Sequence, residues 1–181
     1  GAMALRECAV PLAAGDAALA ARVVAAMLEG VRVKGVDNLP CWTKETRQLR
    51  ARIAFLHRHV AGWPDPDDET VRAALEGFVG GCAKWKDLEK IDLFQVFDFI
   101  LSEHGHDRRE LDRLAPVRME VPSGSRMLIR YEGDEPTVEV RLQECFGLMS
   151  TPKVAGGKVP VVMTLLSPAQ RPVQVTKDFA G

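Results

Sequence analysis

The spacing of apolar residues changes once along the chain, at Pro116, and this change limits the possible folds. Before Pro116, apolar residues recur every three to four positions, which is typical of amphipathic helices. After it, apolar and polar residues alternate, which is typical of half-buried strands. The sequence therefore predicts an α+β chain. A helical bundle occupies domain 1–115, and a small antiparallel β-module, for which an oligonucleotide-binding-like barrel is one arrangement, occupies domain 116–181.

Capping residues and turn residues divide these two parts into elements. In the first part we expect helices that begin near Asp16, Thr43, Asp65 or Asp67, and Asp92, and a last short helix that ends at Pro116. In the second part, three alternating segments separated by Pro122–Gly124 and Gly133–Pro136 predict an antiparallel meander. Further extended segments are expected at 153–155, 158–165 and 171–177.

Charge is distributed unevenly, although the net charge of the whole chain is only −1. Residues 32–58 contain seven basic and two acidic side chains, whereas residues 65–103 contain four basic and ten acidic ones. Binding to nucleic acid therefore requires a local patch. Arginine forks on the helix that begins at Thr43 suit phosphate oxygens. The alternative is a solvated helix face that pairs with the acidic region, and the charge pattern alone favours this alternative.

No motif for an active site is present in the sequence. Gly156-Gly157-Lys158 resembles the end of a phosphate-binding loop, but Pro152 and Val159 occupy positions where GxxxxGK[ST] requires Gly and Ser or Thr. A DExH tetrad is also absent. We therefore expect this polypeptide not to hydrolyse ATP, and we predict no catalytic residue, cofactor site or metal site. A hairpin turn is the favoured interpretation of the Gly-Gly pair.

The four cysteines, at positions 8, 41, 82 and 145, form no CxxC pair, which excludes a zinc ribbon. Scattered reduced thiols indicate a cytoplasmic protein. The sequence contains no run of about 18 apolar residues, so no membrane span is predicted.

Several runs after residue 110 carry a resemblance to a known family. The most specific are VRLQECFGL at 140–148, TPKVAGGKVP at 151–160 and LLSPAQRP at 165–172. Upstream, QLRARIAFL at 48–56 extends the similarity more weakly. These runs resemble the carboxyl-terminal region of HrpB-type bacterial DEAH-box ATP-dependent helicases.

The resemblance implies an accessory region of an ATP-dependent RNA helicase, detached from its ATPase core. In that family the core consists of RecA-like domains, and helical accessory domains and a β-module lie along the nucleic-acid path. ATP and Mg²⁺ are expected for the missing core, and no cofactor is expected for this fragment. The expected partners are the core in cis and single-stranded nucleic acid, with RNA favoured.

We therefore expect the fragment to guide the strand or to regulate the core. The candidate nucleic-acid contacts, chosen from charge and expected exposure, are Arg47, Arg50, Arg126, Arg130, Lys158 and Arg171. Base stacking is expected to be modest, because the β-module has few aromatic residues, namely Tyr131, Phe146 and Phe179. The alternative is a protein-interaction module whose acidic residues 65–103 dock the core or another partner.

Overall fold

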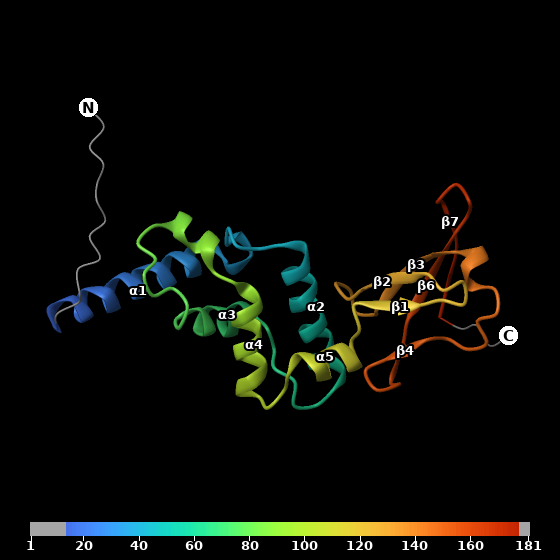
Figure 1. The fold of residues 1–181 in the computed structure, drawn as a ribbon, viewed down its shortest axis with the longest axis horizontal. Coiled ribbons are helices and arrows are strands. Elements are labelled where there is room, and N and C mark those ends of the chain that lie inside the picture. Colours follow the sequence, from blue (N-terminus) through green and yellow to red (C-terminus); the bar gives the residue numbers. More distant parts are fainter. Residues whose placement is uncertain (1–13, 178–181) are drawn as a thin grey trace.

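The computed structural model describes residues 14–177, and the helical and β-rich parts lie end to end along its long axis (Figure 1). The helices are α1 (Ala14–Lys34), α2 (Lys44–His59), α3 (Asp68–Leu75), α4 (Leu93–Glu103) and α5 (Arg108–Leu114). Short 3-10 turns lie at η1 (Val36–Asn38) and η2 (Trp85–Lys90). Cys8 and Phe179 fall outside the described residues.

Three of the predicted helix starts are confirmed, and each has a capping side chain. The Thr43 hydroxyl accepts a hydrogen bond from the Thr46 backbone N–H at 3.2 Å. Asp67, rather than Asp65, accepts from the Thr70 N–H at 2.7 Å, and Asp92 caps α4. Each cap satisfies a backbone donor that the first helical turn leaves without a partner.

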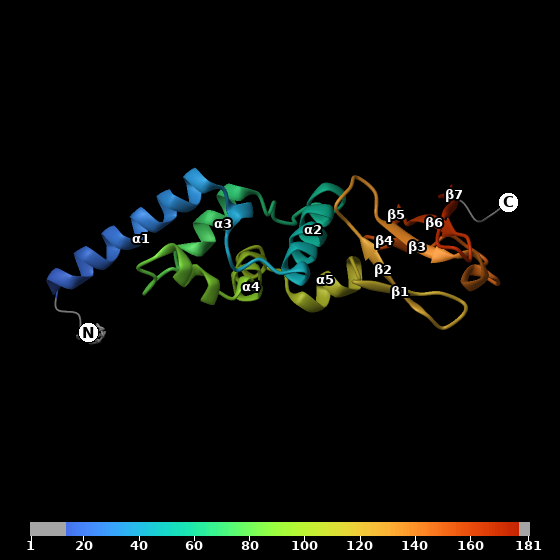
Figure 2. The same cartoon turned by 90° about the horizontal axis from the view of Figure 1, so that it is seen from above.

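The first half of α1 extends away from the other elements (Figure 2). Leu19 and Val23 are exposed, whereas Leu28 and Val31 are buried, so the helix packs only through its second half. Within residues 14–177, no helix combines the length and apolar character needed to cross a membrane.

The β-rich part contains one five-stranded sheet, in the order β1-β2-β3-β6-β7. Its strands are β1 (Arg118–Glu120), β2 (Arg126–Arg130), β3 (Thr137–Arg141), β6 (Val162–Leu166) and β7 (Pro172–Thr176). A separate hairpin joins β4 (Lys153–Val154) to β5 (Val159–Pro160). The predicted antiparallel meander of the first three strands is confirmed.

The sheet is mixed, which corrects the prediction of a wholly antiparallel module. β6 lies beside β3 and runs parallel to it, with Val140 opposite Leu165. Residues 142–161, which include η3 (Leu142–Cys145) and the β4–β5 hairpin, make the crossover that a parallel pair requires. Among the strands that the structure describes, β1 and β7 are the two edges, so the sheet is open and forms no closed barrel.

Helix α2 joins the two parts of the molecule. Phe55 and Tyr131 pack with ring centroids 5.0 Å apart, inside one hydrophobic core that continues from the helices into the sheet. Gln48 Nε2 donates to the Ile129 carbonyl at 3.1 Å, and the buried Arg52 donates to the Ala115 carbonyl at 2.6 Å. The division into two domains between residues 115 and 116 stays a prediction.

Cys41, Cys82 and Cys145 are free and buried. Burial raises the pKa of the Cys41 thiol to about 11, and it also raises the pKa of the other two thiols. These thiols are therefore protonated at neutral pH, which makes them poor nucleophiles.

Candidate nucleic-acid interface

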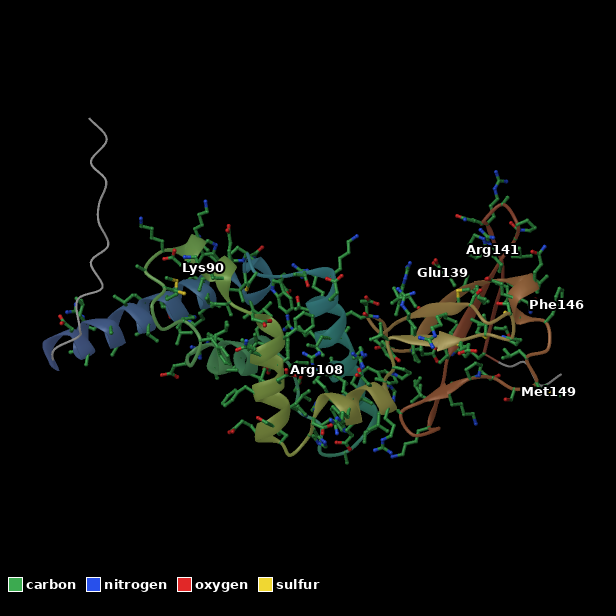
Figure 3. The ribbon with its side chains drawn as sticks, viewed as in Figure 1. Lys90, Arg108, Glu139, Arg141, Phe146 and Met149 are labelled. Atoms are coloured by element: carbon green, nitrogen blue, oxygen red, sulfur yellow. The ribbon has the colours of Figure 1, made fainter. Side chains whose placement is uncertain are left out.

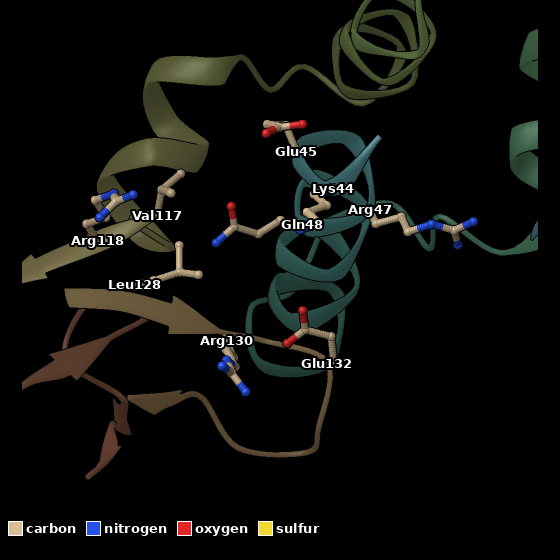
Figure 4. A pocket seen from close by; sticks show the side chains of 9 residues that line it. All are labelled: Lys44, Glu45, Arg47, Gln48, Val117, Arg118, Leu128, Arg130 and Glu132. Atoms are coloured by element: carbon tan, nitrogen blue, oxygen red, sulfur yellow. The ribbon is translucent and has the colours of Figure 1, made fainter. Parts of the chain in front are cut away.

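A groove lies between the first turns of α2 and strands β1 and β2 (Figure 4), and we call it the sheet groove. It encloses about 480 Å³. Val117 and Leu128 provide apolar surface, and most of the other lining side chains are charged. The full lining consists of Lys44, Glu45, Arg47, Gln48, Val117, Arg118, Leu128, Arg130 and Glu132.

Strand alternation continues this basic surface across the sheet. Arg126, Leu128 and Arg130 are exposed on β2, whereas Met127 and Ile129 point toward the core. The register places Arg118 opposite Leu128, and the same alternation exposes Arg141 on β3. We call the outer side of β1–β3 the arginine face; its charged residues are Arg118, Glu120, Arg126, Arg130, Glu139 and Arg141.

The arginines of this face keep donors that can reach a ligand. The Arg130 guanidinium lies 3.5 Å from the Glu139 carboxylate. Both side chains are exposed, so this ion pair is weak in water. Arg118 donates one bond, of 3.3 Å, to the Arg126 carbonyl. The guanidinium groups of Arg126 and Arg141 have no bonded partner among residues 14–177. An extended anion on this face would therefore meet several accessible guanidinium groups.

A second groove lies beside α2, and we call it the tryptophan groove. It encloses about 450 Å³ and shares Arg47 and Glu132 with the sheet groove. Figure 4 shows the Arg47 side chain directed away from Leu128, across α2. The lining consists of Asp37, Trp42, Arg47, Arg50, Ala51, Ala54, Arg58, Tyr131 and Glu132.

Arg50 is engaged by the protein itself. Its guanidinium donates to the Pro66 carbonyl at 2.8 Å, to Asp37 at 2.8 Å and to Asp68 at 2.7 Å. These bonds fix α2 to η1 and to the start of α3. The Arg50 side chain of α2 is thus paired with the acidic region 65–103, through Asp68. This agrees with the alternative interpretation of the charge pattern.

The other candidates fall into two groups. Arg47 is exposed and donates one 3.2 Å bond to the Asp37 carbonyl. It lines both grooves, and in the sheet groove it does so together with Leu128 and Arg130 of β2. Lys158 and Arg171 are exposed at the tips of the β4–β5 and β6–β7 turns. Neither lines the two grooves, so the structure does not bring these two residues together with Arg47 and Arg130.

Four basic residues of this region are not among the six candidate contacts chosen from the sequence. Lys44 and Arg118 line the sheet groove, Arg58 lines the tryptophan groove, and Arg141 lies on the arginine face. The alternation that places Arg130 on the polar side of its strand also applies to Arg118 and Arg141. Helical periodicity alone does not show which side of α2 faces the sheet.

Aromatic side chains contribute little to the arginine face. Tyr131 is buried, and its hydroxyl donates to the Pro116 carbonyl at 2.7 Å. Burial raises the pKa of this phenol. Phe146, with 70% of its surface exposed, lies with Met149 at the end of the β-rich part farthest from the helices (Figure 3). Ligands of the arginine face would therefore be held mainly through charge.

The Gly156–Gly157 pair forms the predicted hairpin turn. Both glycines have positive φ, of 68° and 85°, and the chain continues into the short strand β5. A phosphate-binding loop instead precedes a helix whose N-terminus faces the phosphate. Gly156 and Gly157 are therefore not arranged as a loop that binds the phosphates of ATP. For a metal ion, the described range 14–177 contains no group of three or more His, Cys, Asp or Glu side chains with suitable geometry.

Comparison with known families assigns the chain to one of them. Residues 74–181 match the family described as ATP-dependent helicase C-terminal (HrpB_C), and the chain belongs to this family. It is similar to the ATP-dependent RNA helicase HrpB of Escherichia coli K12, with 41% identity over 162 residues. That alignment covers 86% of this chain and 20% of the relative. The resemblance inferred from the sequence is confirmed.

Solved structures agree with this assignment. The crystal structure of the E. coli DExH-box NTPase HrpB matches 94% of this chain and 21% of its own, with 37% identity and a TM-score of 0.73. A second crystal structure, of the Escherichia coli DEAH/RHA helicase HrpB, matches 86% of this chain and 20% of its own at a TM-score of 0.70. The chain thus spans about one fifth of the length of these relatives.

Proposed function

We propose that this chain guides single-stranded RNA as an accessory region of an ATP-dependent RNA helicase. The supporting observation is that α2, β1, β2 and β3 contribute basic side chains to one continuous surface, formed by the sheet groove and the arginine face. Guanidinium forks that keep accessible donors suit phosphate oxygens. A surface of this kind binds the backbone of a strand with little dependence on its sequence.

The rest of the helicase belongs to the same proposal. ATP and Mg²⁺ are assigned to a core that adjoins this region in a longer protein of the cytoplasm, and this core is the partner in cis. Phosphate contacts made here would hold the strand while the core hydrolyses ATP. The accessory region itself performs no chemical step.

Salt dependence tests the proposal. The 181-residue chain is titrated with a fluorescently labelled oligouridylate at several salt concentrations. Each phosphate contact contributes about −0.7 to the log–log slope, so three contacts give a slope of about −2. The double variant Arg118→Ala/Arg130→Ala is expected to weaken binding and to flatten the slope by about 1.4.

Lys90→Ala is the matched control, because Lys90 is exposed on the helical part, away from the sheet (Figure 3). It is expected to leave the affinity and the slope unchanged. Absence of binding at micromolar protein in low salt, or a slope near zero, would contradict the proposal.

A second candidate function, protein docking, has its own supporting observation. Between α3 and α4 lies a cavity of about 390 Å³ with Phe99, 44% exposed, and the carboxylates of Glu69 and Glu103 on its lining. This surface suits a basic, apolar segment of the helicase core. A complex with a separately produced core is expected to survive nuclease treatment and to be weakened by Phe99→Ser; dissociation by nuclease would exclude this candidate.

A further inference from the structure

We propose that the tryptophan groove is a nucleotide subsite, in which a base packs against Trp42 and its phosphate meets Arg47 and Arg58. The inference rests on the proposed function, because the ligand would be one nucleotide of the same RNA strand. It goes further in assigning recognition of a base to a particular side chain. The arginine face, in contrast, would contact the backbone alone.

Trp42 is held rigidly enough to act as a stacking surface. Its indole N–H donates to the Val36 carbonyl at 2.8 Å, and its ring packs against Phe97 with centroids 5.9 Å apart. The ring is partly buried and lines the groove, where the guanidinium groups of Arg47 and Arg50 lie over it, 5.1 Å and 5.8 Å from its centroid. A stacking base would take the place of the exposed Arg47 guanidinium, which would then meet the phosphate. A fixed aromatic ring loses little conformational entropy when a base stacks on it, and stacking accepts any base.

Two guanidinium groups of this groove are available for a phosphate. Arg47 donates to the Asp37 carbonyl at 3.2 Å, and Arg58 donates to the Gly133 carbonyl at 2.8 Å. Because an arginine carries several N–H donors, each keeps others for an anionic oxygen. Arg50 is already bonded to three acceptors, so it lines the groove without contributing to phosphate binding.

The carboxylates of the groove favour a nucleotide over a bare phosphate. Asp37 is paired with Arg50 at 2.8 Å, so its charge is offset. Glu132 is exposed, and no partner for its carboxylate lies among residues 14–177. An unpaired carboxylate repels a phosphate but accepts hydrogen bonds from the amino group of a base or from a ribose hydroxyl.

The size and position of the groove agree with this ligand. Its volume of about 450 Å³ lies within the usual range of small-molecule sites. Arg47 and Glu132 line both grooves, so a strand in the sheet groove reaches the tryptophan groove by crossing the first turns of α2. Charged contacts and the stacking surface would therefore act on neighbouring nucleotides.

The test compares two strands that differ only in their bases. The unmodified 181-residue chain is titrated with an oligoadenylate and with an abasic strand of the same length and phosphate number. Stacking of one base is expected to make the oligoadenylate bind about tenfold more tightly. Trp42→Ala is expected to abolish this difference and to leave the salt slope unchanged. Arg58→Gln is expected to weaken binding of both strands.

Trp85→Ala is the matched control, because Trp85 also lies beneath a cation, Lys34 at 4.1 Å, but lines neither groove. It is expected to preserve the preference for bases. Equal binding of both strands by the unmodified chain would overturn the nucleotide subsite while leaving the guiding function in place. Absence of binding to either strand would refute both proposals, and this comparison does not depend on whether Trp42→Ala folds.

Discussion

At the scale of single residues, the partners of an arginine decide what it can do. Arg50 and Arg52 lie two residues apart on α2, and both are held by acceptors within the protein. Arg47 and Arg130 keep accessible donors. The sequence identifies all four as cations. It does not identify their partners, because Pro66, Asp68 and Ala115 are brought to α2 only by the tertiary fold.

Arg52 tests the structural role of a buried arginine. Its guanidinium donates to the Ala115 carbonyl at 2.6 Å and to Asp112. We expect Arg52→Leu to lower the free energy of unfolding by about 2 kcal/mol, because the buried carbonyl loses its donor. Urea denaturation measures the change. Arg109→Ala, at an exposed position of α5, is expected to cost less than about 0.5 kcal/mol. Equal costs for both variants would contradict this role.

His106 is expected to make stability depend on pH. Its ring stacks on Trp63, and both ring nitrogens face acceptors: Glu110 at 2.8 Å and the Gly62 carbonyl at 3.0 Å. Burial disfavours the charged ring, but these hydrogen bonds and the nearby Asp107 raise its pKa above 6.5. The stabilisation of the folded chain by charged His106 is therefore present below pH 6.5. It is lost as the pH rises through the pKa that His106 has in the folded state.

Thermal unfolding across this pH range tests the role of His106, with His106→Gln as the comparison. The melting temperature of the unmodified chain is expected to fall relative to that of the variant as the pH rises. Parallel curves for the two proteins would show that His106 does not contribute this dependence. An NMR titration of the ring protons gives the pKa directly.

At the scale of elements, local signals predicted the helices better than the sheet. The caps at Thr43, Asp67 and Asp92 and the helical spacing of apolar residues are properties of neighbouring residues. The pairing of β3 with β6 depends on a crossover, and strand alternation carries no information about the partner of a strand. This is why the mixed sheet was not predicted.

The α2 cap is the element-scale test. The Thr43 hydroxyl accepts from the Thr46 N–H, and the Thr46 hydroxyl in turn accepts from the Thr43 N–H at 2.9 Å. We expect Thr43→Ala to lower the free energy of unfolding by about 1 kcal/mol, and Thr43→Ser to cost clearly less because it keeps the acceptor. Chemical denaturation distinguishes the two. The same loss in both variants would show that the methyl group, and not the cap, matters.

At the scale of the whole molecule, the single hydrophobic core connects the helices to the sheet. The change of apolar spacing at Pro116 correctly predicted a helical part followed by a β-rich part. It did not show that α2 packs against both, because the contact between Phe55 and Tyr131 joins residues far apart in the sequence.

We expect the chain to unfold in urea as one cooperative unit. The three tryptophans report on the helical part, and Cys145, which is buried beside the sheet, reports on the β-rich part. Tryptophan fluorescence and thiol labelling of Cys145, resolved by mass spectrometry, are expected to give the same midpoint. Labelling of Cys145 at distinctly lower urea would show that the β-rich part opens independently.

The contacts of α2 with the sheet also have a mechanical consequence. Gln48, Arg52 and Arg58 tie this helix, along most of its length, to the β-rich part or its junction. Arg50 ties the same helix to α3. Among the residues that the structure describes, a tension applied to the sheet would therefore pass through α2 into the helical part. A displacement of the sheet is therefore expected to move the start of α3 as well.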